Sequence, residues 1–443
     1  MTERLIVLSD LHLAPPGPLN NFHAGHALAA FVQEIARPDV TLVLAGDAFD
    51  FLQVDDRPGT LDGPAMPALI RATLDAVADT PWGRDLYKNL GDLLDRGGRC
   101  VVLPGNHDPE VAHPSFREDL LAKAGRPPNH PGLTVHTRGP WRTNIGPREI
   151  VVGHGHRHDP WNDIHPDTVE AALQGQPAAL PPGSRLVTEV LNAFKNARDE
   201  RGALRFPFVD LLKPEVPAVP LLLLYLDHDR AMKHLLPALD VGVDALTEKL
   251  AKALLGSDTL GPGTAAPTTS PAHDIARALA VTYTATERKN PRRCADDLGD
   301  WLHGEDSGVV EGTLAAHGGI RPRLLRAFLR SASDEGRFFN REHLSGDDRA
   351  IVLQHLPPNA PPRVVIAGHT HAAREVWLNE SHAYINTGTW TDLIEYPAKI
   401  DDAELRTWID RLERREIPRV QRLTYAEVTP EKGTLESYPP GSS

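Results

Sequence analysis

Five short apolar runs, each ending in a turn that carries aspartate or histidine, constrain the fold of this 443-residue chain most strongly. Continuous apolar runs of this length are typical of strands buried on both faces. The first three runs alternate with helical patterns, which indicates an α/β sandwich with parallel strand pairing. The runs are RLIVLSD (4–10), VTLVLAGD (40–47), CVVLPGNHD (100–108), EIVVGHGH (149–156) and RVVIAGHTH (363–371).

The polar residues at these five strand ends are candidates for one common site, because ligands of open α/β sheets bind beyond the carboxyl ends of the strands. Residues two apart in an extended segment face the same side, so Asp10 with His12, and His369 with His371, can each present two ligands to one pocket. The glycines that precede candidates, at positions 46, 105, 153 and 368, allow tight turns and close backbone approach. The candidates are Asp10, His12, Asp47, Asp50, Asn106, His107, Asp108, His154, His156, His369 and His371.

These residue types suit a dinuclear metal centre. Two cations about 3.5–4 Å apart need a bridging ligand, and a carboxylate with its two oxygens bridges well. Imidazole nitrogens and an amide oxygen can fill the other positions without excess negative charge. Each motif alone also fits a turn, a helix cap or an ordinary buried histidine. The ordered set of five, each behind a predicted strand, favours the metal centre over these structural roles.

The middle of the chain has a different pattern. Strand signals fade from about residue 160, and amphipathic helical segments follow, with a Gly/Pro/Thr-rich tract at 256–271 that indicates a surface loop. We therefore expect a core at 1–160 and 360–430, a mostly helical insertion at 161–359 and a flexible tail at 431–443. The apolar segment Leu221–Leu226 fits either the insertion's own core or the wall of an acyl pocket.

Composition limits the kind of protein further. The net charge is 47 − 60 = −13, which disfavours a broad nucleic-acid surface. The two cysteines are far apart in the sequence and suggest neither a disulfide framework nor a cysteine zinc site. The sequence shows neither a signal peptide nor an apolar stretch long enough to span a bilayer. We expect a cytoplasmic protein.

The motifs SDLHL, LAGDAFDF, PGNHD, VVGHGH and IAGHTH, followed by INTGTW, resemble those of the calcineurin-like metallophosphoesterases. The resemblance covers about residues 1–160 and 360–430. It implies a four-layer α/β/β/α fold and hydrolysis of a phosphoester by a metal-activated hydroxide. It also implies two divalent metal ions, and ligands of this type suit manganese, iron or zinc.

The resemblance further implies a role for each residue. Asp10, His12 and His371 would hold the first metal, whereas Asn106, His154 and His369 would hold the second. Asp47 would bridge the two. His107 would be the catalytic histidine that assists the leaving oxygen, and Asp50 would orient it. The spacing within VVGHGH leaves a choice open, because His156 shares a side with His154 and could contact the substrate or replace His154 as the ligand.

The motif shapes are most similar to those of bacterial UDP-2,3-diacylglucosamine pyrophosphatase-like enzymes. Those enzymes carry arginine at the position of His107 and HGD where this chain has HGH, and their insertion is shorter. The resemblance therefore implies a phosphodiester or pyrophosphate hydrolase, with a phosphomonoesterase possible, acting on a phosphorylated small molecule or lipid. The alternatives are a metal-dependent nuclease, supported only by basic clusters at 288–293 and 321–330, and a non-enzymatic scaffold.

Overall fold

Two β-sheets pack face to face in the computed structural model, which describes residues 4–55, 57, 59–213, 218–238, 243–255, 271–303, 320–333, 339–357, 361–395 and 402–439. The chain divides into two compact units. Unit 1 comprises Met1–Ser184, Phe338–Leu393 and Arg419–Ser443, and it contains both large sheets. Unit 2 comprises Arg185–Arg337 and Ile394–Pro418.

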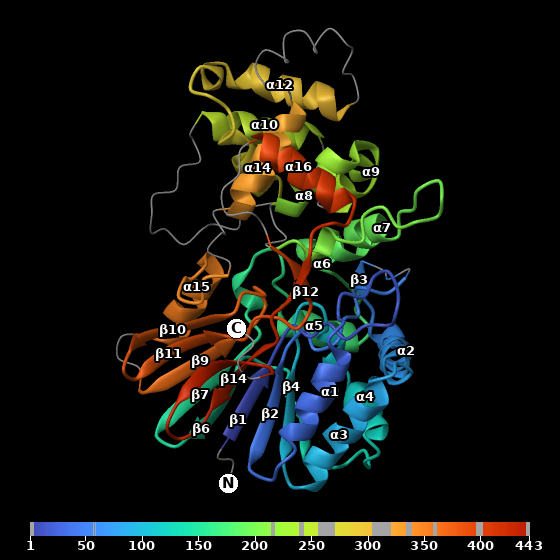
Figure 1. Ribbon diagram of the computed structural model, residues 1–443, viewed down its shortest axis with the longest axis vertical. Helices are drawn as coiled ribbons and strands as arrows, with labels where there is room; N and C mark the ends of the chain where they lie inside the picture. Colours follow the sequence, from blue (N-terminus) through green and yellow to red (C-terminus); the bar gives the residue numbers. More distant parts are fainter. Residues whose placement is uncertain are drawn as a thin grey trace. The chain divides into compact units, whose positions relative to one another are not determined.

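The first sheet carries four parallel strands and an antiparallel edge pair (Figure 1). Its order is β15 (Gly433–Ser437), β14 (Thr424–Val428), β1 (Arg4–Leu8), β2 (Val40–Ala45), β4 (Arg99–Leu103) and β5 (Leu133–Val135). The second sheet has three parallel strands between two antiparallel edge strands. Its order is β10 (Arg374–Asn379), β11 (His382–Asn386), β9 (Arg363–Ala367), β7 (Arg148–Val152) and β6 (Trp141–Ile145).

The continuous apolar runs are explained by burial on both faces of each sheet. In β9, Val364 and Ile366 join the core between the two sheets, whereas Val365 and Ala367 pack against α15 on the other face. Removing apolar surface from water on both sides stabilises the strand and excludes polar residues from its length. Polar residues therefore gather where the strands end, which is where the predicted motifs lie.

Helices cover the outer faces of the sheets (Figure 1). Those beside the first sheet are α1 (Gly25–Glu34), α2 (Met66–Ala78), α3 (Gly83–Asp95) and α4 (Pro114–Lys123), and α15 (Gly346–His355) covers the second sheet. This arrangement confirms the predicted α/β/β/α layers. Shorter elements of unit 1 are β3 (Thr60–Leu61), η1 (Gly63–Ala65), η2 (Pro109–Ala112), η3 (His156–His158), α5 (Pro166–Leu173), β8 (Ala178–Ala179) and β13 (Arg419–Gln421). Two elements cross from unit 1 into unit 2: α6 (Pro182–Arg185) ends on the first residue of the first segment of unit 2, and β12 (Asp392–Ile394) ends on the first residue of its second segment.

Unit 2 is helical in its described part. Helix α8 packs against α14 and buries Leu221–Leu224 almost completely, which supports a core role for this apolar segment. The elements are η4 (Leu186–Leu191), α7 (Asn192–Lys195), η5 (Val209–Leu211), α8 (Ala218–Leu226), α9 (His228–Ala238), α10 (Val243–Leu254), α11 (Pro271–Ala280), η6 (Glu287–Lys289), α12 (Pro291–Leu302), α14 (Ile320–Ser333) and α16 (Asp402–Glu413). None of the described helices is both long and apolar enough to cross a bilayer.

The compact units differ from the segments expected from sequence. Residues 161–184 and 339–357, expected in the insertion, cluster with unit 1, and α16 clusters with unit 2. Residues Gly433–Ser437, expected in a flexible tail, form β15 and pair with β14. The expected surface loop at 256–271 lies outside the described residues except for its last position.

Candidate metal centre

Unusual backbone turns present the candidate ligands at the strand ends. Asp10, His12, Asp47, His369 and His371 all have φ between 50° and 70°, a left-handed conformation that costs energy for residues with a Cβ. The prediction that the pairs 10/12 and 369/371 lie in extended segments is wrong, because the strands end at Leu8 and Ala367. Concentration of strained backbone at one site is typical of a functional centre.

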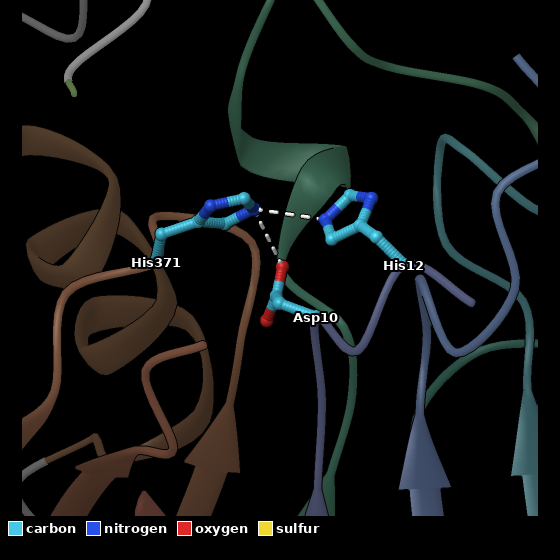
Figure 2. A group of neighbouring side chains, drawn as sticks. All are labelled: Asp10, His12 and His371. Carbon is cyan, nitrogen blue, oxygen red and sulfur yellow. Dashed lines mark hydrogen bonds and ion pairs between the residues drawn. The ribbon is translucent and has the colours of Figure 1, made fainter. Parts of the chain in front are cut away.

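A first cluster joins Asp10 and His12 to His371, which comes from a motif more than 350 residues later in the chain (Figure 2). Nε2 of His371 lies 3.2 Å from Oδ1 of Asp10 and 3.1 Å from Nε2 of His12. All three side chains are buried. Since Nδ1 of His12 faces the Asp50 carboxylate at 2.9 Å and donates to it, Nε2 of neutral His12 offers a lone pair to the cluster.

A second cluster joins Asn106, His154 and His369. Nε2 of His154 lies 3.2 Å from Oδ1 of Asn106, and Nδ1 of His369 lies 3.1 Å from the same oxygen. Nδ1 of His154 donates to the carbonyl oxygen of Ala45 at 2.9 Å, so its Nε2 also offers a lone pair when the ring is neutral. His369 and His371 thus belong to different clusters, as the resemblance implies.

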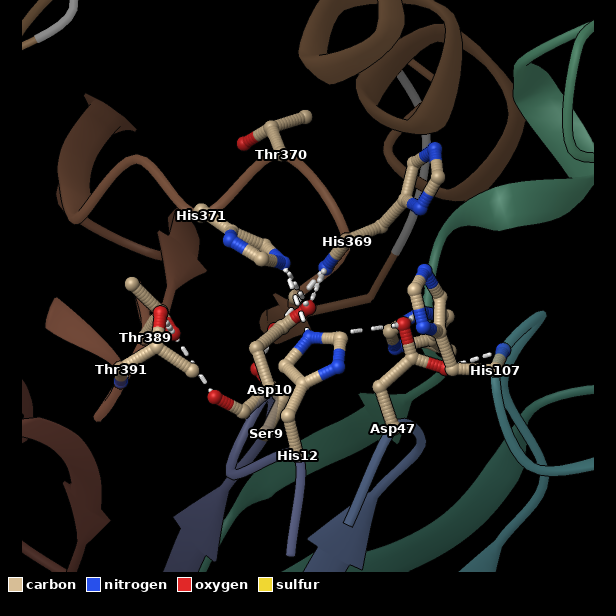
Figure 3. Close-up of polar contacts among 12 residues, drawn as sticks. Ser9, Asp10, His12, Asp47, His107, His369, Thr370, His371, Thr389 and Thr391 are labelled. Carbon is tan, nitrogen blue, oxygen red and sulfur yellow. Dashed lines mark hydrogen bonds and ion pairs between the residues drawn. The ribbon is translucent and has the colours of Figure 1, made fainter. Parts of the chain in front are cut away.

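Asp47 connects the two clusters. Figure 3 shows its side chain at the strand ends together with Asp10 and His12. Its Oδ2 lies 3.1 Å from Nε2 of His154 and 3.9 Å from Nε2 of His12. Its Oδ1 accepts a hydrogen bond of 2.8 Å from the backbone N–H of His107, which fixes the carboxylate. Asp47 therefore has the position that a bridging ligand requires.

The donor set fits divalent cations. Carboxylate, amide and imidazole atoms that can all act as acceptors point toward one another, and such an arrangement is stable only around positive charge. Burial alone would lower the pKa of His154, but the charge of Asp47 raises it to about 9, so a proton supplies that positive charge in the metal-free protein. Burial alone would raise the pKa of Asp10, yet His371 and His154 lower it to about 2.

Asp50 and His107 form a buried pair beside the first cluster. Oδ2 of Asp50 lies 3.0 Å from Nδ1 of His107, and Asp50 is fully buried. Burial alone would raise the pKa of Asp50, but His107 and His12 lower it well below its usual range. The ionised carboxylate accepts only, so it fixes Nδ1 of His107 as the nitrogen that carries a hydrogen.

Three of the four predicted glycines are required by close contacts. A Cβ on Gly46 would lie 2.4 Å from the His154 ring, and one on Gly105 would lie 2.1 Å from Oδ1 of Asp47. A Cβ on Gly368 would lie 2.1 Å from the Ser9 hydroxyl. At Gly153 the nearest atom is 3.7 Å away, so space does not require glycine there.

His156 lies beside the second cluster, next to the ring of His154. Its ring centroid is 5.4 Å from that of His154, and its buried Nδ1 has no hydrogen-bond partner among the described residues. Burial lowers the pKa of His156 well below its usual range. The residue lines a cavity of about 320 Å³ together with His154. The wall combines aliphatic side chains, which include Leu103, Val151, Ile164, Val169, Ile351 and Val365, with the polar side chains of Thr137, Arg157, His158, Gln354 and His355.

Several supporting residues were not assigned a role by sequence reasoning. Asp108 accepts hydrogen bonds from the backbone N–H groups of Asp47, Ala48, Phe49 and Gly105 at 2.6–3.2 Å, and so joins the turns after β2 and β4. The Asp10 carbonyl accepts bonds from the Thr389 hydroxyl at 2.7 Å and the Trp390 backbone N–H at 3.3 Å. These residues lie in the motifs GNHD and NTGTW. Their hydrogen bonds join turns that are far apart in the sequence, so the sequence alone does not predict them.

The comparison with protein families gives one match. The family model described as calcineurin-like phosphoesterase matches residues 3–185. The search of curated proteins gives no match. The match supports the predicted superfamily for this part of the chain, and together with the Asp/His clusters it supports a metal-dependent phosphoesterase that uses divalent metal ions.

Proposed function

On the premise that residues 3–185 belong to the calcineurin-like phosphoesterase superfamily, we propose that this protein uses two divalent metal ions to hydrolyse a phosphodiester or pyrophosphate bond. The observation that carries the proposal is the position of Asp47, whose Oδ2 faces a histidine of each cluster. In this assignment the first metal binds Asp10, His12 and His371, the second binds Asn106, His154 and His369, and Asp47 binds both.

The bound cations would supply a hydroxide nucleophile near neutral pH and neutralise charge on the phosphate oxygens. Hydrolysis forms one bond from a water oxygen to phosphorus and breaks the bond to the leaving oxygen, which must gain a proton. Protonated His107 is the proposed donor of that proton through Nε2, because its Nδ1–H is held by Asp50. The negative charge of Asp50 would stabilise protonated His107 before the substrate binds.

The cavity beside His154 supports a substrate with a sizeable group on the phosphate. It measures about 320 Å³, and aliphatic side chains such as Ile164 and Val169 form part of its wall, beside polar ones such as Arg157 and His158. A second substituent on the phosphate could pack against these apolar side chains and gain binding energy there. A small phosphomonoester has no such substituent. This feature favours a phosphodiester or a pyrophosphate over a small phosphomonoester.

The basic clusters do not favour a nuclease. Arg323 is buried and pairs with Glu287, while Arg288 donates to the carbonyl oxygens of Ala280 and Tyr283. Arg330 donates to the carbonyl oxygen of Val281 at 2.6 Å. These guanidinium groups are engaged in contacts within unit 2, so they support its packing rather than binding of a phosphate backbone.

The test uses purified full-length protein loaded with Mn²⁺, metal analysis, and two chromogenic substrates, 4-nitrophenyl phosphate and bis(4-nitrophenyl) phosphate. We expect two metal ions per chain and faster hydrolysis of the diester. Two bound metals without hydrolysis of either substrate would contradict the enzyme assignment. Absence of bound metal together with absence of hydrolysis would support the scaffold alternative instead.

A variant separates catalysis from metal binding. For a diester whose alkoxide leaving group needs a proton, His107→Asn should lower kcat by about 10²–10⁴-fold, the usual contribution of a positioned acid or base. It should retain both metals, because His107 is not among the proposed ligands. Unchanged turnover in this variant would remove His107 from the proposed mechanism.

A further inference from the structure

We propose that Asp159 determines which atoms of two ligands face the second metal, acting on His369 directly and on Asn106 through Asn162. One carboxylate would fix the tautomer of His369 and the orientation of the Asn106 amide. The proposal rests on the proposed function, since it concerns residues assigned there to the second metal. Asp159 and Asn162 follow the motif HGHRH and come from the segment after η3, which the mechanism does not otherwise use.

The contacts form a continuous chain from Asp159 to the metal ligands. Oδ2 of Asp159 lies 3.0 Å from Nε2 of His369 and 2.7 Å from Nδ2 of Asn162. Oδ1 of Asn162 lies 3.2 Å from Nδ2 of Asn106. The other oxygen of Asp159 accepts a 2.9 Å bond from the backbone N–H of Trp161, so the carboxylate is held in place.

The first branch of this chain determines the state of His369. An ionised carboxylate only accepts hydrogen bonds, so Nε2 of His369 must carry the hydrogen that it donates to Asp159. In neutral His369 the lone pair then lies on Nδ1, the atom that faces Oδ1 of Asn106 at 3.1 Å. Partners of this kind fix the tautomer and raise the basicity of a metal-binding histidine.

The second branch determines which way two amides point. Because Asp159 accepts, Asn162 must turn its NH₂ group toward Asp159 and its oxygen toward Asn106. Asn106 must then turn its own NH₂ group toward Asn162, which directs Oδ1 to His154 and His369. Amide oxygen and nitrogen are nearly equal in size, so only hydrogen-bond partners can select the orientation that binds a cation.

The packing around Asn162 fixes the positions of the residues that form these hydrogen bonds. The backbone N–H of Gly183 donates to the carbonyl oxygen of Trp161 at 2.7 Å, and a Cβ on Gly183 would lie 2.2 Å from Oδ1 of Asn162. The hydroxyl of the next residue, Ser184, donates to the backbone carbonyl of Asn106 at 3.3 Å. Two segments of unit 1 thus contact Asn106: Asn162 bonds to its side-chain amide, and Ser184 bonds to its backbone carbonyl.

The experiment measures Mn²⁺ binding to the full-length protein by titration and by electron paramagnetic resonance. Asp159→Asn and Asn162→Ala should each weaken the second Mn²⁺ by about 10–100-fold, the usual effect of losing a partner of a metal ligand. The first Mn²⁺ should bind as in the wild type. The spectrum should change from that of a coupled pair to that of a single ion, and retained binding of the first ion shows that the variants are folded.

Asp163→Asn is the matched control. Asp163 lies in the same segment, is exposed and pairs with Arg157, so its substitution should leave both affinities unchanged. Wild-type affinity for two ions in both Asp159→Asn and Asn162→Ala would overturn the inference alone. Failure of the wild-type protein to bind two ions would overturn the proposed function as well, and the two results are therefore distinguishable.

Discussion

His12 and His107 share one carboxylate oxygen. Their Nδ1 atoms lie 2.9 and 3.0 Å from Oδ2 of Asp50, and their rings are nearly perpendicular at a centroid distance of 4.6 Å. The other oxygen of Asp50 accepts backbone N–H bonds from Leu52 and Gln53, which hold the carboxylate in place. A proposed ligand of the first metal and the proposed proton donor are therefore oriented by the same group.

Asp50→Asn should impair two properties at once. In the amide one of the two oxygens becomes an NH₂ donor, so either both histidines or the N–H groups of Leu52 and Gln53 lose their acceptor, and the negative charge beside both rings is lost. We expect both weaker binding of the first Mn²⁺, by about tenfold or more, and a lower kcat. His107→Asn should lower kcat alone. Metal titration and steady-state kinetics on both variants check this, and normal metal affinity in Asp50→Asn would show that His12 does not need the shared carboxylate.

Gly105→Ala should displace the proposed bridging carboxylate. The added methyl group would lie 2.1 Å from Oδ1 and 2.6 Å from the backbone nitrogen of Asp47, and both groups must move. We expect fewer than two metal ions per chain and loss of most diesterase activity. Gly346→Ala is the control, because no atom lies within 4 Å of its added Cβ. Equal metal content in the two variants would argue against a bridging position for Asp47.

The sequence was sufficient to predict the strands and the residues at their ends. Each apolar run ends in a motif at the same edge of a sheet, and that regularity follows from burial of the strands on both faces. The sequence could not predict that Asp10 and His371 reach their cluster from left-handed turns, because backbone φ of such residues depends on tertiary contacts. It also left His154 and His156 as alternatives, whereas the structure places only His154 against Asp47 and Asn106.

The contacts of Asp159 could not be predicted from the sequence either. The partner of Asp159 is His369, 210 residues later, and no periodicity relates the two positions. The extent of unit 1 was also not predictable in detail, because residues 161–184 show helical and turn patterns like those of unit 2. Their membership follows from contacts such as that between Ser184 and Asn106.

Binding of the second metal should depend on pH. In the metal-free protein the pKa of His154 is raised to about 9, mainly because the charge of Asp47 outweighs the effect of burial. Below that pH the ring holds a proton that must leave before Nε2 can bind a cation. The affinity for the second Mn²⁺ should therefore rise from pH 6 to pH 8. Titrations at three pH values check this, and an affinity that does not change with pH would contradict the role of His154.

The stability of the metal-free protein should change in the opposite direction. A histidine whose pKa is raised on folding stabilises the folded state fully below its unfolded value, about 6.5, and that stabilisation is lost as pH rises toward the folded value. The contribution of His154 should thus decline between about pH 6.5 and 9. Thermal unfolding of metal-free wild type and His154→Gln measures it. The difference in Tm between the two should be larger at pH 6.5 than at pH 9, and a constant difference would show that His154 is not paired.

Filling the cavity beside His154 should discriminate between substrates by size. Ile164 is buried and lines this cavity, so Ile164→Trp would occupy part of its 320 Å³. We expect kcat/KM to fall about tenfold or more for bis(4-nitrophenyl) phosphate, because losing an apolar contact commonly changes kcat/KM by about 10–200-fold. For methyl 4-nitrophenyl phosphate, which has a small second substituent, kcat/KM should change little. Leu353→Trp adds the same ring at a side chain that is 78% exposed, and it should affect neither substrate. Equal losses for the two diesters in Ile164→Trp would mean that the cavity does not hold the second substituent of the phosphate.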